Sequence, residues 1–445
     1  MGTFTLMRAL IESYIHEKAS RADILNLQEK RFRKILKFAY KNSKFYNKLY
    51  NSNGIKENDL ATIDISKIPT VNKDLVIDNF DDVIVPNGIA KKEVLEFLEK
   101  SNDPNDLFKN KYHVIHTSGS SGKIGYFIYN KKEWDFFFTY LTKLYKFSFS
   151  KNKTAFIGAA GGHFTAASSL AWASDMGLTK LFCESLILSI NKPLDENIEK
   201  LNQFQPDILV GYFNSLRILA EKQEQGILNI KPRYLVSSGE GITPRGKKYI
   251  EKIFNLPLAN MYAFCECFFL GVGKTEYNGI YLRDDLALIE IKDNYILLTN
   301  LINKTQPIIR YRIDDYVVLK NDPVKKLPFT LIDDVVGRNE ATIWLENKEG
   351  NMDFIHPLVM TDFYVKGLDK LQIILKDKKS FDLMIVVKGK DEKIVVKEAK
   401  NKMDILLSEK NFDDVKYKIK VVKDIPIDEK TGKFKLIVKQ KSYNY

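Results

Sequence analysis

The sequence predicts an α/β protein in which a large N-terminal domain of mixed and parallel sheets with helices precedes a small α+β domain. In the middle of the chain, short apolar runs alternate with helical patterns, which is the order typical of a parallel α/β sheet. Farther on, the strands become short and alternating, and after Gly337 and Arg338 the pattern changes again. At 445 residues the chain is long enough for about two or three domains.

The first half of the chain supplies the helices and the parallel strands. Residues 21–50 place apolar residues at helical spacing among many lysines, which predicts an amphipathic helix. The strands are expected from the apolar runs TAFIGAA, DILVGY, YLVSSGE and LANMYAF. The helices between them are expected from FNSLRILAEKQEQG and TPRGKKYIEKIF. Ligands of such sheets bind at the carboxyl ends of the strands.

The second half predicts two further units. Residues 277–301 read as short alternating strands of an antiparallel layer. The tail contains the strand-like LQIILKD, FDLMIVVKG and VKYKIKVV and the helical pattern EKIVVKEAKNKMDILLSEK, which predicts an α+β unit of roughly 100 residues. We therefore divide the chain into residues 1–338 and 339–445.

Composition restricts the function classes. The net charge of +12 favours anionic partners, but the lysines are spread along the chain, so we do not expect nucleic-acid binding. Cys183, Cys265 and Cys267 are an odd number, and the N-terminus lacks a secretory leader, which indicates the reducing cytoplasm. Residues 154–174 carry no charge, but glycines and serines interrupt them, so no membrane span is expected.

A loop rich in glycine and hydroxyl side chains follows the strand-like YHVIH. In Thr117–Gly125, TSGSSGKIG, successive backbone N–H groups can form a concave site for anions, and Lys123 adds a positive charge. The spacing is neither that of the P-loop nor that of the dinucleotide-binding motif, because Gly119, Gly122 and Gly125 are each three residues apart. On this stretch alone, a phosphate-binding loop and an ordinary surface loop are equally supported.

Further segments in the same order carry a family resemblance. TSGSSGKIG resembles the phosphate-binding loop of the adenylate-forming superfamily of acyl-CoA synthetases. SSGEGITPRGKKYIEKIF and MYAFCE resemble its Gly-Glu and Tyr-Gly-x-Thr-Glu segments, and IPIDEKTGKFK resembles its closing Gly-Lys motif. PIIRYRIDD, LQEKRFRKILKFAYKNSKFYNKLY and IPTVNKDLVIDNFDDVI are similar to the branch of phenylacetate–CoA ligases and capsule-biosynthesis proteins. The resemblance covers nearly the whole chain and implies a large adenylate-forming domain followed by a small mobile domain.

The resemblance implies ATP-dependent, Mg²⁺-assisted adenylation of a carboxylic acid and a role for each matching residue. Lys433 would be the catalytic cation on the small domain, Arg338 would reach the ribose or the α-phosphate, and Glu266 would hold Mg²⁺. Asp315 would accept the ribose hydroxyls. The remaining nucleotide-binding residues would be Thr117, Ser118, Gly119, Ser120, Ser121, Gly122, Lys123, Gly239, Glu240 and Tyr262. The family's hinge falls near Asn339 and Glu340.

The acyl pocket is expected from residues that fall where the family lines its substrate site: His163, Phe164, Tyr212, Phe213 and Ala263. For the first four, core packing explains the side chain as well as substrate contact does. The Tyr-Gly-x-Thr-Glu motif has become Tyr262-Ala263-Phe264-Cys265-Glu266, which removes a flexible glycine and a hydroxyl. These changes concern the acyl side of the site more than the nucleotide side.

Three hypotheses follow for the function. The acyl group passes to a thiol, either coenzyme A or the phosphopantetheine of an acyl carrier protein; or it passes to an amine or hydroxyl; or the chain is a non-catalytic nucleotide-binding homologue. Retention of Lys433 favours the first two, because binding alone does not need a lysine on a mobile domain. A homodimer is compatible with this interpretation.

Overall fold

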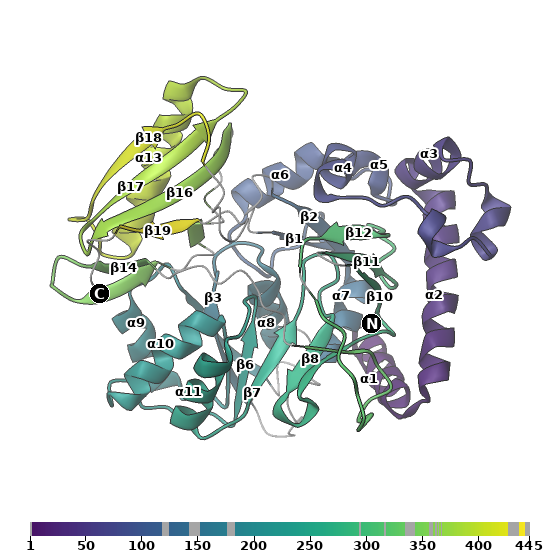
Figure 1. Cartoon of the computed structure of the whole chain (residues 1–445), viewed down its shortest axis with the longest axis horizontal. Helices are drawn as coiled ribbons and strands as arrows, with labels where there is room; N and C mark the ends of the chain where they lie inside the picture. Colours follow the sequence, from purple (N-terminus) through teal and green to yellow (C-terminus); the bar gives the residue numbers. More distant parts are fainter. Residues whose placement is uncertain are drawn as a thin grey trace.

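The computed structural model describes residues 2–117, 124–141, 152–175, 183–292, 295–315, 317–333, 343–355, 359–360, 363, 365, 367–425 and 436–440. At its centre lies an eight-stranded sheet of strand order β13-β9-β8-β7-β6-β5-β3-β4 (Figure 1). Strands β4, β3, β5, β6 and β7 are parallel, whereas β7, β8, β9 and β13 pair antiparallel. The bounds are β3 Asn152–Gly158, β4 Cys183–Ser189, β5 Ile208–Gly211, β6 Tyr234–Ser238, β7 Leu258–Tyr262, β8 Gly271–Lys274, β9 Gly279–Leu282 and β13 Leu331–Ile332. The predicted mixed α/β sheet is confirmed.

The helices that connect the parallel strands pack against this sheet. They are α8 Thr165–Asp175, α9 Leu194–Phe204, α10 Phe213–Glu224 and α11 Pro244–Phe254. Helix α11 begins with Pro244 in its first turn, and the Thr243 hydroxyl accepts a 3.3 Å hydrogen bond from Gly246 N, as expected for an N-cap. Leu216 and Leu219 of α10 pack with Leu209 and Leu235 of the sheet, and this apolar layer fixes the loops at the strand ends.

A helical layer formed by the N-terminus lies beside the sheet (Figure 1). It contains α1 Gly2–Lys18, α2 Arg21–Asn42, α3 Lys44–Ser52, α4 Lys73–Asp78, α5 Phe80–Val83 and α6 Lys91–Lys100, with the 3₁₀ helices η1 Glu57–Ala61 and η2 Ile65–Lys67. The single helix predicted for residues 21–50 is two helices, because the chain is extended at Ser43, whose hydroxyl caps the second by accepting from Tyr46 N.

Two smaller β units complete the large part of the molecule. The hairpin β1 Tyr112–His116 and β2 Tyr126–Asn130 leads into α7 Lys131–Leu141. Strands β10 Ala287–Ile291, β11 Ile296–Asn300 and β12 Tyr311–Ile313 form the predicted antiparallel layer, and η5 Thr275–Tyr277 precedes β9. Val71 pairs with Tyr311: Val71 N donates to Arg310 O at 3.1 Å, and Arg312 N donates to Val71 O at 2.9 Å. This pairing fixes the start of α4 beside β12.

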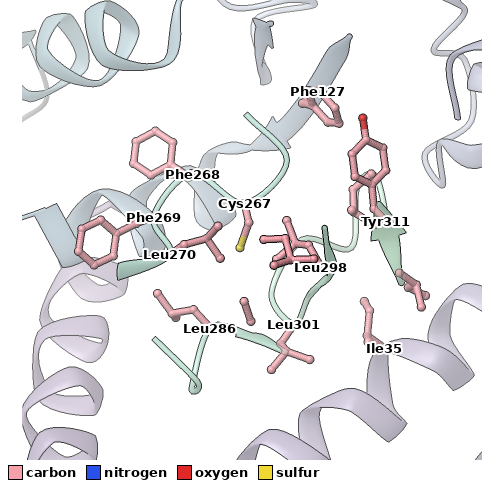
Figure 2. Packing of buried hydrophobic residues seen from close by; sticks show 14 of the residues in the cluster. Ile35, Phe127, Cys267, Phe268, Phe269, Leu270, Leu286, Leu298, Leu301 and Tyr311 are labelled. Atoms are coloured by element: carbon pink, nitrogen blue, oxygen red, sulfur yellow. The ribbon is translucent and has the colours of Figure 1, made fainter. Parts of the chain in front are cut away.

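One apolar cluster joins these units (Figure 2). The segment after β7 contributes Cys267 and Leu270, which are fully buried with Leu298 of β11. Ile35 of α2 belongs to the same cluster, so the N-terminal helices share a core with the sheet. The edge of Phe127 faces the Tyr311 ring at a centroid distance of 6.4 Å. The backbone that carries Glu266 is therefore held by packing on both sides.

The C-terminal unit, residues 367–425 and 436–440, has its own sheet of order β18-β17-β16-β19 and one long helix. Its elements are β16 Leu368–Asp377, β17 Ser380–Val387, α13 Glu392–Glu409, β18 Lys416–Val421 and β19 Ile437–Lys439, and the hairpin β14 Ile343–Glu346 and β15 Met352–Ile355 precedes it. The helix and strands predicted for the tail are confirmed. The proposed boundary at residue 338 lies outside the described residues and stays a prediction.

No helix in the described part of the chain is both long and apolar enough to cross a membrane.

Candidate functional site

Two of the predicted nucleotide-binding residues meet at the carboxyl end of β7. Tyr262 is the last residue of that strand, and Asp315 follows β12. The Tyr262 hydroxyl donates a 3.1 Å hydrogen bond to Asp315 Oδ2. Burial, followed by the nearby Asp315 carboxylate, raises the pKa of the Tyr262 phenol, so this hydroxyl stays protonated and acts as a donor. The carboxylate of Asp315 is thus oriented from the sheet.

Glu266 lies close to this pair and is buried, with 7% of its surface exposed. Burial raises the pKa of its carboxyl above 4.5, whereas a hydrogen bond from the Tyr311 hydroxyl and the charge of Lys73 lower it. The Asp315 carboxylate is near enough to raise it further. Asn300 Nδ2 donates to Glu266 O at 3.0 Å and fixes the backbone. A buried carboxylate beside a second carboxylate is the kind of group that a cation stabilises.

Lys73 is a functional candidate that the sequence analysis did not identify. It begins α4, and Asn72 caps that helix by accepting from Leu75 N at 2.9 Å. Burial lowers the pKa of the Lys73 ammonium, and the charges of Glu266, Cys265 and Asp74 raise it. Its Cε lies 3.4 Å from the position that a Cβ on Gly125 would occupy. The strand pairing of Val71 with Tyr311 brings this lysine to Glu266 from far away in the sequence, and residue patterns do not reveal such a pairing.

The predicted phosphate-binding loop is closed at its base by hydrogen bonds between Thr117 and Gly125, and we call these two residues the neck of the loop. Thr117 N donates to Gly125 O at 2.9 Å, and Gly125 N donates to Thr117 Oγ1 at 2.8 Å. The Thr117 hydroxyl therefore already accepts one hydrogen bond within the loop. The residues of the loop itself, Ser118, Gly119, Ser120, Ser121, Gly122 and Lys123, lie outside the described residues, and so do Arg338 and Lys433. Their assignments stay predictions.

Cys265 stands where the family motif has threonine, and its thiol faces the same neck. The Sγ atom donates to His116 O at 3.3 Å and lies 3.2 Å from Thr165 Oγ1 at the start of α8. The Tyr129 hydroxyl donates to Cys265 O at 2.7 Å. Ala263 and Phe264 precede it, and the Phe264 ring packs edge-on against Tyr262 at 4.9 Å. The altered motif is therefore a connected part of the site.

Gly239 and Glu240 follow β6 and contact the start of α10. Gly239 has a φ of +77°, and a Cβ there would lie 2.9 Å from the Tyr212 ring, so only glycine fits. Glu240 accepts from Asn214 N at 2.8 Å and from Asn214 Nδ2 at 3.1 Å. Its side chain thus caps α10, which leaves the backbone of this segment to face a ligand.

The aromatic candidates for the acyl pocket separate into two groups. Phe164 lines a cavity of about 320 Å³ between the loop after β3 and helix α13. His163 is buried, with Nε2 2.9 Å from Ser101 Oγ and its ring 4.9 Å from Phe97. Phe213 is buried in the core between the sheet and its helices. Tyr212 packs edge-on against Phe156 at 6.0 Å. Packing partners account for His163 and Phe213. Phe164 packs against His116 at a centroid distance of 4.5 Å and also lines the cavity.

The expected magnesium fits the chemistry of this donor set. Within the described ranges, no group of three or more His, Cys, Asp or Glu side chains could hold a metal ion alone. Mg²⁺ is commonly bound through one or two carboxylates together with substrate phosphates and water. Glu266, a buried carboxylate at the neck of the predicted phosphate loop, is suited to that arrangement.

The described residues form one architecture, a large α/β part followed by a small α+β unit. Solved structures of 2-hydroxyisobutyryl-CoA ligase share it. The one with 2-HIB-AMP and CoA in the thioesterification state has a TM-score of 0.62 at 15% identity, covering 95% of this chain and 91% of that one. Its open conformation has a TM-score of 0.56 at 15% identity, over 92% and 90%. At this identity the likeness concerns the fold alone.

Among known proteins, the chain is 26% identical to Protein CapK of Staphylococcus aureus over 340 residues, which are 74% of this chain and 70% of CapK. No family model matches the chain. The fold predicted from the sequence motifs is therefore confirmed. The assignment to the phenylacetate–CoA ligase and capsule-biosynthesis branch stays a prediction.

Proposed function

We propose that this protein activates a carboxylic acid with ATP, forming an acyl-adenylate and pyrophosphate, and then transfers the acyl group to a thiol of coenzyme A or of a carrier-protein phosphopantetheine. The observation that carries the proposal is the grouping of Tyr262, Asp315, Glu266 and Lys73 at the neck of the Thr117–Gly125 loop. These residues come from three separate segments: the start of α4, the end of β7 with the loop after it, and the segment after β12.

The chemistry explains why these residue types are needed. A carboxylate that attacks the α-phosphate of ATP brings two anions together, so the site must supply positive charge where the transition state is most negative. Lys73 is a cation whose charge acts on Glu266, and Lys433 would supply a second cation. Mg²⁺ held by Glu266 would offset the charge of the phosphates when it is bound. The loop N–H groups would cradle the departing pyrophosphate.

The nucleoside end of ATP fits the other half of the grouping. Asp315 has two carboxylate oxygens that can accept from both ribose hydroxyls, and Tyr262 fixes its orientation from the sheet. The ring of Tyr262, with Phe264 edge-on beside it, offers a face for the adenine. The backbone of Gly239 and Glu240 would line the same pocket, because the side chain of Glu240 is already used to cap α10.

The finer assignments belong to the same proposal. Residues 339–445 would form a mobile domain that carries Lys433, and Phe164 would line the route to the acyl group. The solved ligase of the same fold was crystallised with an acyl-adenylate and CoA, and this supports a thiol as the acceptor here. Placement in the phenylacetate–CoA ligase branch rests on the motifs around Pro307–Asp315.

The experiment is an exchange assay between ATP and labelled pyrophosphate with a panel of carboxylic acids and Mg²⁺. The proposal predicts exchange that depends on one class of acid and disappears without Mg²⁺. Nucleotide binding with no acid-dependent exchange across the panel would identify a non-catalytic homologue instead. Adding coenzyme A, a carrier protein or hydroxylamine to the active reaction then separates transfer to a thiol from transfer to an amine.

A further inference from the structure

The hairpin β14–β15 packs against two hydrophobic cores at once. Ile343, Leu345 and Ile355 belong to the core of the C-terminal unit. Trp344 and Phe354 are paired across the hairpin with ring centroids 5.5 Å apart, and they belong to the core of α9, α10 and the central sheet. Successive side chains of a strand point to opposite faces, so this hairpin is a layer shared by the two parts of the molecule.

A buried ion pair lies at the same junction. Lys410 Nζ at the end of α13 lies 3.2 Å from Asp353 Oδ1, and the two side chains are 1% and 7% exposed. Lys410 Nζ also donates to Lys192 O at 2.8 Å, while Asp353 Oδ2 accepts from Leu194 N at 2.8 Å. Leu194 is the first residue of α9, where a carboxylate is favoured by the unpaired N–H groups of the helix. Each charge therefore has one partner in the pair and one in the backbone at the start of α9, and Asp353 Oδ1 also accepts from Phe354 N at 2.6 Å.

Such a pair is suited to selecting an arrangement more than to adding stability. Desolvation offsets most of the attraction within a buried ion pair, whereas removing one partner is strongly unfavourable. If the C-terminal unit moves with its hairpin, both backbone hydrogen bonds to charged groups are lost. Trp344 and Phe354, which are 7% and 1% exposed, also leave the core of the large part. These contacts at the start of α9 therefore oppose movement of the C-terminal unit away from the large part.

We propose that Asp353 and Lys410 are a positioning pair that fastens the C-terminal unit to the start of α9 and sets the share of molecules in the observed arrangement. The consequence for catalysis rests on the proposed function, in which Lys433, between β18 and β19 in the sequence, must approach the site for one half-reaction and leave for the other. Substitutions that remove the pair should then change the rates of the two half-reactions by different factors.

Hydrogen exchange at the Leu194 amide tests the fastening without any activity. Lys410→Met leaves Asp353 in place as the acceptor for Leu194 N, so faster exchange there reports separation of the two parts. We expect exchange at Leu194 to rise about tenfold or more, and less in the double variant D353N/K410M, which keeps an acceptor oxygen and leaves no unpaired buried charge. The matched control is Lys348→Met on the same hairpin, whose 4.0 Å contact with Asp413 is exposed. Unchanged exchange at Leu194 in both pair variants overturns the proposal.

A second measurement separates positioning from a purely structural role. Rates of adenylate formation and of thiol transfer from supplied acyl-adenylate are compared in both pair variants and in Lys348→Met. We expect the ratio of the two rates to shift about tenfold in Lys410→Met, to shift in the same direction in the double variant and to stay constant in the control. Equal losses in both half-reactions overturn the positioning role. Absence of adenylation in the unmodified chain would count against the proposed function, while the exchange measurement still decides the fastening.

Discussion

The Tyr262 hydroxyl donates a 3.1 Å hydrogen bond to Asp315 Oδ2, joining the last residue of β7 to the segment after β12. This contact fixes the carboxylate that we assign to the ribose. Asp315→Ala should weaken ATP binding by about 10- to 100-fold, since hydrogen bonds to a charged group contribute about 1.5–3 kcal/mol each. Tyr262→Phe should weaken it less. Calorimetric titration with ATP measures both. Asp314→Ala is the matched control, because Asp314 is exposed and bonded to Arg312 at 2.7 Å; equal effects at 314 and 315 would refute the ribose assignment.

We expect protonation of Glu266 to cause the acidic limb of the pH profile, which is the decline of adenylation activity at low pH. Burial raises the pKa of its carboxyl above 4.5, and a carboxyl must be ionised to bind Mg²⁺. As the pH falls through the raised pKa, a proton replaces the cation, so Mg²⁺-dependent adenylation should decline at a higher pH than for an exposed glutamate. Glu266→Gln should need much more Mg²⁺ at every pH and lose this limb. An unchanged Mg²⁺ requirement, measured from pyrophosphate exchange, would exclude Glu266 as the ligand.

We expect deprotonation of Lys73 to cause the alkaline limb of the pH profile, which is the decline of adenylation activity at high pH. Burial lowers the pKa of its ammonium below 10.5, so its charge is lost as the pH rises through that lowered value, and adenylation should decline below pH 10.5. Lys73→Met should slow adenylation by about 10²-fold, the loss typical of one transition-state donor. Lys73→Arg, which keeps its charge, should retain part of the rate and lose the alkaline limb. Lys67→Met, at an exposed lysine of η2, serves as the control, and an equal loss there would refute a specific role for Lys73.

Lys433→Ala should slow adenylate formation by about 10²–10³-fold, while thiol transfer from supplied acyl-adenylate should suffer much less. Single-turnover rates of the two half-reactions test this. Lys439→Ala, at an exposed position of β19, is the control. If the rates of both half-reactions fall equally in Lys433→Ala, the lysine has a structural role, and the proposed movement of Lys433 between the two half-reactions is wrong.

Much of the fold could be predicted from local patterns. The apolar runs TAFIGAA, DILVGY, YLVSSGE and LANMYAF correspond to the parallel strands that end at Gly158, Gly211, Ser238 and Tyr262, because alternation of strand and helix is a local property of the chain. Residues 21–50 became two helices because Ser43 both ends one helix and caps the next. Serine inside a helical pattern is common enough that periodicity alone does not reveal such a break.

The candidate site could be predicted where its residues lie in sequence motifs, but not where contacts between distant segments bring a residue to it. Tyr262, Glu266 and Asp315 were identified from motif order, and they lie together. Lys73 joins them only through the pairing of Val71 with Tyr311, a contact between distant segments that leaves no periodic pattern. The cap that Glu240 forms on α10 and the ion pair of Asp353 with Lys410 are also contacts between distant segments, so local patterns do not reveal them.

The central claim is that ATP lies across the neck of the Thr117–Gly125 loop with its ribose against Asp315. A crystal structure with a non-hydrolysable ATP analogue and Mg²⁺ tests this most directly. The proposal predicts ribose hydroxyls within hydrogen-bond distance of the Asp315 carboxylate, phosphates at the loop, and the metal beside Glu266. A nucleotide bound elsewhere, with Asp315 still bonded only to protein groups, would contradict it.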